Sequence, residues 1–321
     1  MQGWSLDTIR GMLMGGAVGD ALGAPHEFMS QRSVPYTGLL TERTKVRTRW
    51  QGTFTLALGQ ITDDTEMTLI IARSLVANRG YNRDYVLKEY MQWAGEMKLL
   101  GRNTRELFKG VKTIKGYETR YKKQFSKPMS EWTQSNGALM RVSPLALLFD
   151  NQPVLTDTSL TNPHPVTLDI NLVYTQGLRL AAAGIDRQTI FLMMQQMAQT
   201  PEVQAVFQQI LERKPRDLTE KKGWALHGFY CTLVTLLGFT TFQDAMDWVI
   251  QQSGDTDTNA HIAGAFLGTV MGYEALDKED RTHYNIQVVR NCQTQNGDLP
   301  RPVEYTLVDF DALCQQLFAL N

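Results

Sequence analysis

The chain has 321 residues, of which 43% are hydrophobic, and its 32 lysines and arginines nearly balance its 33 aspartates and glutamates. This length allows one large domain or two ordinary ones, and the balanced charge argues against a broad basic surface for nucleic acid. The cysteines Cys231, Cys292 and Cys314 are odd in number and widely spaced, which argues against a disulfide framework or a thiolate zinc site. The sequence shows no leader pattern and no apolar run of about 18 residues, so we expect a soluble, cytoplasmic protein.

The first predicted helix covers residues 6–22 and is rich in glycine. Its apolar residues recur every four positions, at Ile9, Leu13, Ala17 and Ala21. A glycine in a helix interior costs about 1 kcal/mol relative to alanine, so we expect close packing against another element to compensate. Pro25 disfavours continuation of the helix, and the acidic residues Asp20 and Glu27 lie on either side of it.

The next segments are predicted from their periodicity and their capping residues. Residues 29–60 lack sustained periodicity, so we expect an irregular segment over the core, with a possible short strand at 53–56. A helix capped by residues 62–64 should end near the asparagine and glycine at 78–80. Apolar spacing predicts a helix over 84–97, and Thr104 is expected to cap a further short helix.

A basic segment with interleaved aromatic residues runs from 109 to 132. Aromatic residues among cations could bind a single nucleic-acid strand by stacking and charge. The alternative is a solvated helix whose aromatic residues face the core, and we favour it because no other part of the chain indicates nucleic acid.

The second half of the chain is predicted to be almost entirely helical. Helices are expected over 168–183, 186–213, 223–238, 241–252 and from Ala260 onward, with a final amphipathic segment after residue 280. We find no linker, no internal repeat and no alternation of strands with helices. The sequence therefore predicts a single, predominantly helical domain over residues 1–321.

Two turns are candidates for contacts with a ligand. The turn Ser135-Asn136-Gly137 leads into a predicted helix at 138–141, and backbone N–H groups at a helix start favour phosphate oxygens. The second turn, Asn162-Pro163-His164-Pro165, is rigid and precedes a helix. A capping role is the simplest interpretation of His164.

The most informative stretches are two acidic clusters, Thr62-Asp63-Asp64-Thr65-Glu66 and Gly254-Asp255-Thr256-Asp257-Thr258-Asn259. Each opens a predicted helix, so helix capping alone could explain either one. Two such clusters together favour one shared site. Oxygen ligands without cysteine or paired histidine select Mg²⁺, Mn²⁺ or Ca²⁺. Two ions could be held by four aspartates and two threonines: Asp63, Asp64, Asp255, Asp257, Thr62 and Thr258.

The second cluster resembles two other acidic motifs in its letters. An EF-hand loop is excluded, because Ala260 stands where that loop needs glycine and Phe266 where it needs glutamate. The haloacid-dehalogenase nucleophile loop has similar letters, but it follows a buried strand near the N-terminus. Here the cluster lies late in the chain, after a helical pattern.

Taken together, the motifs resemble the ADP-ribosylglycohydrolase family. The resemblance covers residues 8–275 and rests on four motifs in the family's order: residues 15–23 with Glu27, residues 62–65, residues 135–141 and residues 254–259. It implies an all-α fold, a compact orthogonal helical bundle, whose central cleft holds two Mg²⁺ or Mn²⁺ ions. It also implies cleavage of the bond between ADP-ribose and an acceptor, with arginine favoured over serine, O-acetyl and nucleic-acid linkages.

The resemblance further implies roles for individual residues. Thr62, Asp63, Asp64, Asp255, Asp257 and Thr258 would be the metal ligands, with Asp64 and Asp255 also acting in catalysis. Glu27 would be the base or an ion-contacting acid. Gly101 would cradle the diphosphate with the backbone N–H groups of Ser135, Asn136 and Gly137. Many relatives carry Thr-His at Thr161-Asn162, so the contact near the adenine would pass to Asn162 or His164, or be lost.

Two competing functions share this fold. One is a binding protein that occludes an ADP-ribosyltransferase, which would make that transferase a protein partner. The other is a structural relative without activity. The acidic ligands argue against the structural relative, because buried like charges cost several kcal/mol without a cation.

Overall fold

The computed structural model describes residues 3–28, 36–48, 52–126 and 131–320, and within them the secondary-structure elements are helices apart from one β-hairpin. This confirms the predicted all-α class. No helix in these ranges is both long and apolar enough to cross a membrane. The α-helices are α1 (Leu6–Gly23), α2 (Asp63–Asn78), α3 (Arg83–Glu96), α4 (Arg102–Phe108), α5 (Ile114–Gln124), α6 (Gln152–Ser159), α7 (Pro165–Ala182), α8 (Arg187–Met197), α9 (Pro201–Leu211), α10 (Ala225–Gly238), α11 (Phe242–Gln251), α12 (Thr256–Met271), α13 (Tyr273–Leu276), α14 (Asp280–Arg290) and α15 (Phe310–Phe318). Short 3₁₀ helices are η1 (Ala24–His26), η2 (Glu131–Gln134), η3 (Leu139–Arg141), η4 (Ser143–Leu147), η5 (Thr294–Asn296) and η6 (Val303–Tyr305).

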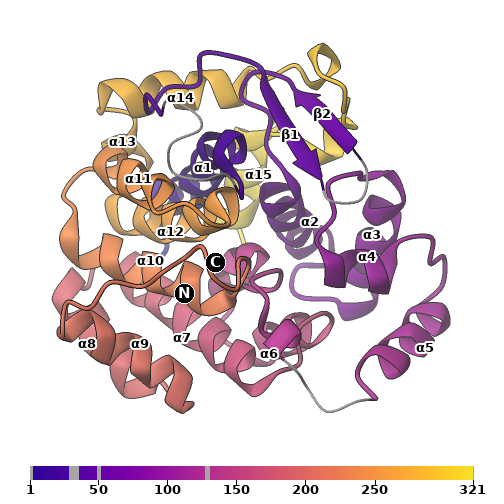
Figure 1. Cartoon of the computed structure of the whole chain (residues 1–321), viewed down its shortest axis with the longest axis horizontal. Helices are drawn as coiled ribbons and strands as arrows, with labels where there is room; N and C mark the ends of the chain where they lie inside the picture. Colours follow the sequence, from indigo (N-terminus) through magenta and orange to yellow (C-terminus); the bar gives the residue numbers. More distant parts are fainter. Residues whose placement is uncertain (1–2, 29–35, 49–51, 127–130, 321) are drawn as a thin grey trace.

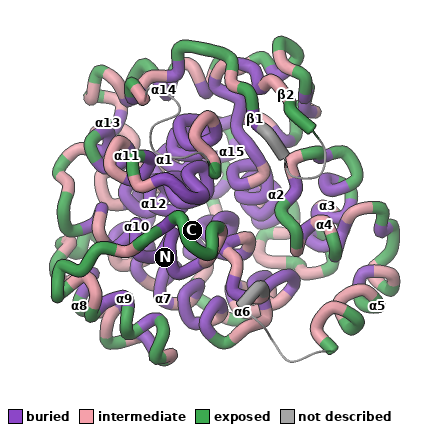
Figure 2. The backbone as a smooth tube through the Cα atoms, in the orientation of Figure 1, coloured by how far each residue is buried: buried purple, intermediate pink, exposed green. Residues whose placement is uncertain are grey.

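Helices α1 and α12 pack against each other at the centre of the molecule, with the other helices around them (Figure 1). Almost every residue of this pair is buried, whereas α5, α8 and α9 at the periphery expose much of their surface (Figure 2). Glycine permits the close approach. A Cβ atom on Gly15 would lie 2.3 Å from the backbone oxygen of Gly264, and one on Gly264 would lie 2.4 Å from the oxygen of Gly15. The expected close packing of the first helix is confirmed.

The same contact continues to the end of α1 and brings it against the start of α12. A Cβ atom on Gly23 would lie 2.4 Å from the Cα atom of Asp257, and the Thr256 hydroxyl donates a hydrogen bond to Gly23 O at 2.8 Å. As a result, the segment that follows α1, with Glu27, lies beside the second acidic cluster.

The C-terminal segment contacts α2 through buried and surface ion pairs. The guanidinium of Arg301 donates two hydrogen bonds, at 2.8 and 2.9 Å, to the carboxylate of Glu66, which also accepts one from Trp93 at 2.6 Å. Both charged side chains are buried. Further along this segment Arg73 of α2 pairs with Asp309. These long-range contacts attach α2 to the C-terminal segment in its first turn, at Glu66, and again at Arg73.

Several predicted boundaries were wrong. Strand β1 (Thr44–Thr48) pairs antiparallel with β2 (Gly52–Leu56), whereas only a strand at 53–56 was expected. Helix α12 begins at Thr256 rather than at Ala260, because Asp255 is its N-cap residue. Gly101, not Thr104, precedes the first turn of α4. The helix expected after Gly137 is the short 3₁₀ helix η3 (Leu139–Arg141) and not an α-helix.

Helix α5 carries the basic aromatic segment, and the aromatic rings of this segment contact one another in a row that begins at Phe108 of α4. The ring centroids of Phe108 and Tyr117 are 5.6 Å apart, those of Tyr117 and Tyr121 5.7 Å, and those of Tyr121 and Phe125 4.6 Å. Tyr117 is buried and donates to Leu160 O at 2.8 Å. Since the rings pack together or face inward, the solvated-helix interpretation agrees with the structure; residues 127–130 lie outside the described ranges.

Candidate active site

A buried aspartate near the end of α1 organises the start of α2. The carboxylate of Asp20 accepts hydrogen bonds from Thr62 N–H at 3.0 Å, from the Thr62 hydroxyl at 2.8 Å and from the Thr65 hydroxyl at 2.5 Å. Asp20 therefore caps α2 from a different helix. Sequence reasoning did not assign it to the site, although its position seven residues before Glu27 was a usable signal.

The first turn of α2 presents oxygen atoms that are not used within the helix. Thr62 is the N-cap residue, but its side chain makes no capping hydrogen bond. Its hydroxyl lies 3.0 Å from Asp64 Oδ2 as well as beside Asp20. The second oxygen of Asp64, Oδ1, is fully buried and makes no hydrogen bond in the described part of the chain. An unpaired buried carboxylate oxygen is costly without a cation or a donor.

The start of α12 supplies the other half of the site. Carboxylate oxygens of Asp255, Asp257 and Glu27 all lie within 4.8 Å of one another. Asp255 is the N-cap residue of α12 but makes no side-chain capping bond. The side chains of Thr62 and Asp255 therefore do not cap their helices, although helix capping is the simplest explanation of acidic and hydroxyl residues at a helix start. We refer to Asp20, Glu27, Asp63, Asp64, Asp255 and Asp257 as the acidic cluster.

The charges of the acidic cluster act on one another. Burial, and then the charge of Asp20, raise the pKa of Asp63 to about 8. The pKa of Asp64 lies well above its usual range for the same two reasons, followed by the charges of Asp63 and Asp255. Burial, and then the charges of Glu27 and Asp64, raise the pKa of Asp257 well above its usual range. The carboxylates of α2 and α12 therefore lie close enough to repel one another.

The residues present fit a divalent cation. The donors are carboxylate and hydroxyl oxygens, and one carboxylate oxygen, Asp64 Oδ1, is buried without a partner. Cations with oxygen ligands, such as Mg²⁺, Mn²⁺ and Ca²⁺, suit this donor set. A bound cation would return the raised pKa values of the cluster toward their usual range, because it favours the charged carboxylates.

The predicted phosphate turn is attached directly to the acidic cluster. Asn136 donates from its side chain to Asp255 Oδ2 at 2.8 Å, and from its backbone N–H to Gly223 O at 2.8 Å. The backbone N–H of Asn136 is therefore engaged within the protein in this structure. Helix α4 also contacts this turn, because the side chain of Asn103 donates a hydrogen bond to the Ser135 hydroxyl at 3.1 Å. Asn103 lies two residues after Gly101.

Asn162 supports this turn from inside the protein. It is buried, and its side-chain N–H groups donate to the Ser135 hydroxyl at 2.9 Å and to Ser135 O at 3.1 Å. Its oxygen accepts from Thr161, whose hydroxyl in turn accepts from Arg141 at 3.0 Å. Arg141 is also buried and pairs with Asp157 at 2.8 Å. The sequence marked Arg141 as part of a motif but did not assign it this supporting position.

His164 caps α7, as its simplest interpretation required. Its Nδ1 accepts from Val166 N–H at 3.1 Å, and its Nε2 lies 3.3 Å from Gln134. Burial lowers the pKa of His164. Because Gln134 directly precedes Ser135, the imidazole lies near the phosphate turn.

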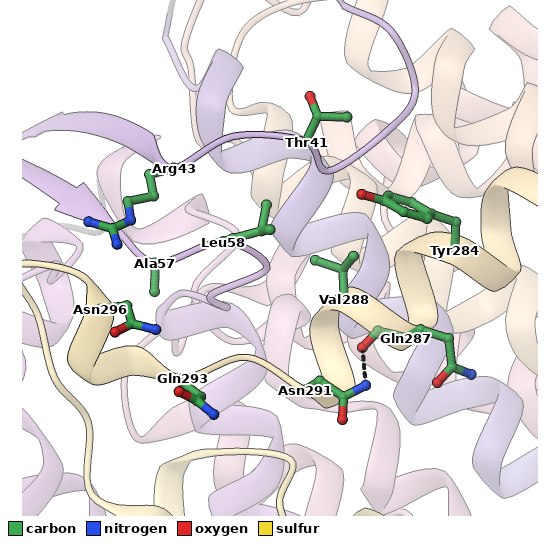
Figure 3. Close-up of a pocket in the computed structure, with 10 residues that line it drawn as sticks. All are labelled: Thr41, Arg43, Ala57, Leu58, Tyr284, Gln287, Val288, Asn291, Gln293 and Asn296. Atoms are coloured by element: carbon green, nitrogen blue, oxygen red, sulfur yellow. Dashed lines mark hydrogen bonds between the residues drawn. The ribbon is translucent and has the colours of Figure 1, made fainter.

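A separate hollow lies between the β-hairpin region and α14. Its volume is about 590 Å³, and Arg43, Tyr284 and Asn291 are among the residues that line it (Figure 3). None of the predicted site residues lines it. The hollow therefore has no part in the candidate site.

Comparison with known proteins gives one consistent family. The family model described as ADP-ribosylglycohydrolase matches residues 3–293. An ADP-ribosyl-(dinitrogen reductase) glycohydrolase from Rhodospirillum rubrum is 25% identical over 90% of this chain and 94% of its own length. The ADP-ribosylarginine hydrolase Tri1 of Pseudomonas putida is 23% identical over 86% of this chain and 73% of its own. A solved structure titled ADP-ribosylglycohydrolase-related protein complex has the same fold, with a TM-score of 0.72, 21% identity and 98% coverage of both chains.

Proposed function

Because this chain belongs to the ADP-ribosylglycohydrolase family, we propose that it hydrolyses the bond between ADP-ribose and a modified protein side chain, with arginine as the favoured acceptor. The observation that carries the proposal is the meeting of Glu27, Asp255 and Asp257 beside the first turn of α2. The names of the Rhodospirillum rubrum and Pseudomonas putida relatives support this reaction class, and the second name supports arginine.

In the proposed site, Thr62, Asp63, Asp64, Asp255, Asp257 and Thr258 would hold two divalent cations, Mg²⁺ or Mn²⁺. When bound, these cations would supply Lewis-acid stabilisation of the ribose hydroxyls and of the charge that develops as the glycosidic bond breaks. Asp20 orients Thr62 through the hydroxyl hydrogen bond at 2.8 Å. The Thr62 proton then points to Asp20, which leaves a lone pair of that oxygen for a ligand.

Glu27 is assigned the proton transfer. Burial, and then the charges of Asp255, Asp63 and Asp20, raise the pKa of its carboxyl well above the usual range. Neutralising those neighbours would lower it again, so that Glu27 becomes a carboxylate able to take a proton from the attacking water. The departing guanidine nitrogen receives a proton as the ribose carbon gains the hydroxyl.

The diphosphate is proposed to lie along Ser135, Gly137 and Gly101. The Ser135 hydroxyl is held by Asn103 and Asn162. Asn162 acts on the substrate through Ser135, while His164 lies next to the same turn through Gln134. We further propose that residues 1–321 act as one domain, since α1, α2 and α12 contact one another and the C-terminal segment contacts α1 and α2.

The test is release of free ADP-ribose from an ADP-ribosyl-arginine peptide and from an ADP-ribosyl-serine peptide, each with Mg²⁺, with Mn²⁺ and with a chelator. We expect metal-dependent release from the arginine peptide. Release in the presence of chelator would contradict the metal-dependent mechanism, and release from the serine peptide alone would contradict the acceptor assignment. Binding of ADP-ribose without hydrolysis of either peptide would contradict the hydrolase.

A further inference from the structure

We propose that the ring of Phe28 is the surface that receives the guanidinium of the ADP-ribosylated arginine, and that Lys222 occupies this surface while the substrate is absent. The inference rests on the proposed function and adds to it the residue that distinguishes arginine from an uncharged acceptor.

The backbone of Phe28 is held in an unfavourable conformation. Its φ angle is 56°, in the left-handed region that bulky side chains rarely adopt. The conformation is fixed by a hydrogen bond from Phe28 N–H to Gly254 O at 2.7 Å, directly before Asp255. Strain of this kind is concentrated at functional sites.

The side chain of Phe28 is not used for core packing. It is 47% exposed, although it follows Glu27, whose carboxylate lies in the acidic cluster. A large apolar ring that is both exposed and held by a strained backbone gains little from burial. Its position next to a cluster of charged groups therefore indicates a contact with a ligand.

A cation already lies over this ring. The Lys222 ammonium is 5.8 Å from the ring centroid, within the range of a cation–π interaction, and 3.4 Å from Phe28 O. The next residue, Gly223, touches the site from the other side: a Cβ atom there would lie 3.2 Å from Asp255 Oδ2, and Gly223 O accepts from Asn136 N–H. Lys222 and Phe28 thus join the segments that flank the acidic cluster.

The position of the ring matches the position of the leaving group. In the proposed site the ribose lies at the acidic cluster and the diphosphate at Ser135, so the acceptor extends to the remaining side, near Glu27. Consecutive Cα atoms are only 3.8 Å apart, which keeps Phe28 close to the bond that breaks. A guanidinium is planar and cationic and stacks on aromatic faces, whereas a serine acceptor offers no charge.

The test compares Phe28→Leu with Phe28→Tyr on an ADP-ribosyl-arginine peptide. Removing the ring should raise KM about 3- to 30-fold, with a much smaller change in kcat, because the ring contacts the guanidinium before the bond breaks. Tyrosine keeps an aromatic face and should restore most of the affinity. Lys222→Met removes the competing charge and should lower KM about 2- to 5-fold. Phe149→Leu, at a ring that is 72% exposed and outside the site, is the matched control and should leave KM unchanged.

Inhibition by ADP-ribose separates this idea from its alternatives, because the product has every part of the substrate except the acceptor. The inhibition constant should be unchanged in Phe28→Leu and in Lys222→Met. A weaker inhibition constant in Lys222→Met would assign that lysine to the diphosphate and overturn its proposed role. An unchanged KM in a folded Phe28→Leu variant would overturn the role of the ring. If the wild-type protein fails on the arginine peptide, the proposed function itself is wrong.

Discussion

Asn136 donates its side-chain amide to Asp255 Oδ2 at 2.8 Å, so the turn proposed for the diphosphate and the N-cap of α12 are joined by one buried hydrogen bond. Both residues are almost fully buried. The bond orients Asp255 toward the acidic cluster and lowers the pKa of its carboxyl against the larger, raising effect of burial. It ties the placement of a proposed metal ligand to the placement of the turn proposed for the diphosphate.

Asn136→Ala should therefore weaken both metal binding and hydrolysis. Loss of a hydrogen bond to a metal ligand commonly reduces metal affinity or activity 10- to 100-fold, and we expect a decrease of about that size in kcat/KM together with weaker Mn²⁺ binding. Calorimetric titration of Mn²⁺ and the peptide assay measure the two effects. The exposed Asn291 near α14 provides the control substitution, Asn291→Ala. Normal Mn²⁺ binding by Asn136→Ala would contradict the orienting role.

Asp63→Ala and Asp255→Ala should lower metal affinity and hydrolysis together, because each removes a proposed ligand. In chelator, however, Asp63→Ala should not be less stable than the wild-type protein, since it removes a buried charge that raises the pKa of Asp64. Thermal unfolding with and without Mn²⁺ tests both statements. Full activity in either variant would refute the two-cation site.

Charge reversal at Lys122 and Lys123 on α5 should leave hydrolysis of a small substrate intact.

Glu27→Gln should keep the metal and lose most of its turnover. The amide preserves the size of the side chain but cannot take a proton from water. We expect kcat to fall by about 10²- to 10⁴-fold, the usual contribution of a general base, with Mn²⁺ affinity within about threefold of the wild type. Unchanged turnover would remove Glu27 from the mechanism, and loss of Mn²⁺ binding would make it a ligand instead.

The metal-free protein should lose stability as the pH rises. The pKa of Asp63 is 3.8 in its ordinary state and about 8 in the folded chain, so between about pH 4 and pH 8 the folded state binds more protons than the unfolded state. The free energy of unfolding then falls with increasing pH across that window. With Mn²⁺ present the stabilisation by metal should grow over the same range, because the cation competes with protons. Thermal unfolding in chelator at several pH values measures the trend, and a rising midpoint would contradict it.

Arg301→Met should strongly destabilise the protein. It leaves the buried Glu66 carboxylate without its bidentate partner, and breaking a buried pair in this way costs about 3–5 kcal/mol. The double variant Glu66→Gln with Arg301→Met should recover part of that loss, because no buried charge is then left unpaired. Urea unfolding of the single and double variants gives the comparison. A loss below about 1 kcal/mol in Arg301→Met would show that this pair does not brace α2.

The local pattern of the sequence was sufficient for the helices and for the residue types of the site. Regular apolar spacing predicted α1, α2, α3, α7, α10 and α11 to within a few residues. The glycines of the first helix indicated a close approach, and Gly15 and Gly264 make it. Acidic residues at two helix starts pointed to one cluster, because capping could explain either stretch alone but two such stretches favour a shared site.

Only the tertiary structure decided which distant residues complete the site. Asp20 bonds to Thr62, Asn136 to Asp255, and Arg301 to Glu66 across long stretches of chain. No local periodicity encodes these partners, since hydrogen bonds between distant residues depend on how the helices pack. The contact between the strained, exposed Phe28 and Lys222 likewise joins distant parts of the chain and has no signal in the local sequence. The sequence therefore indicates what chemistry each residue can perform. Which residues it hydrogen-bonds to is decided by the packing of α1, α2 and α12 around the cluster.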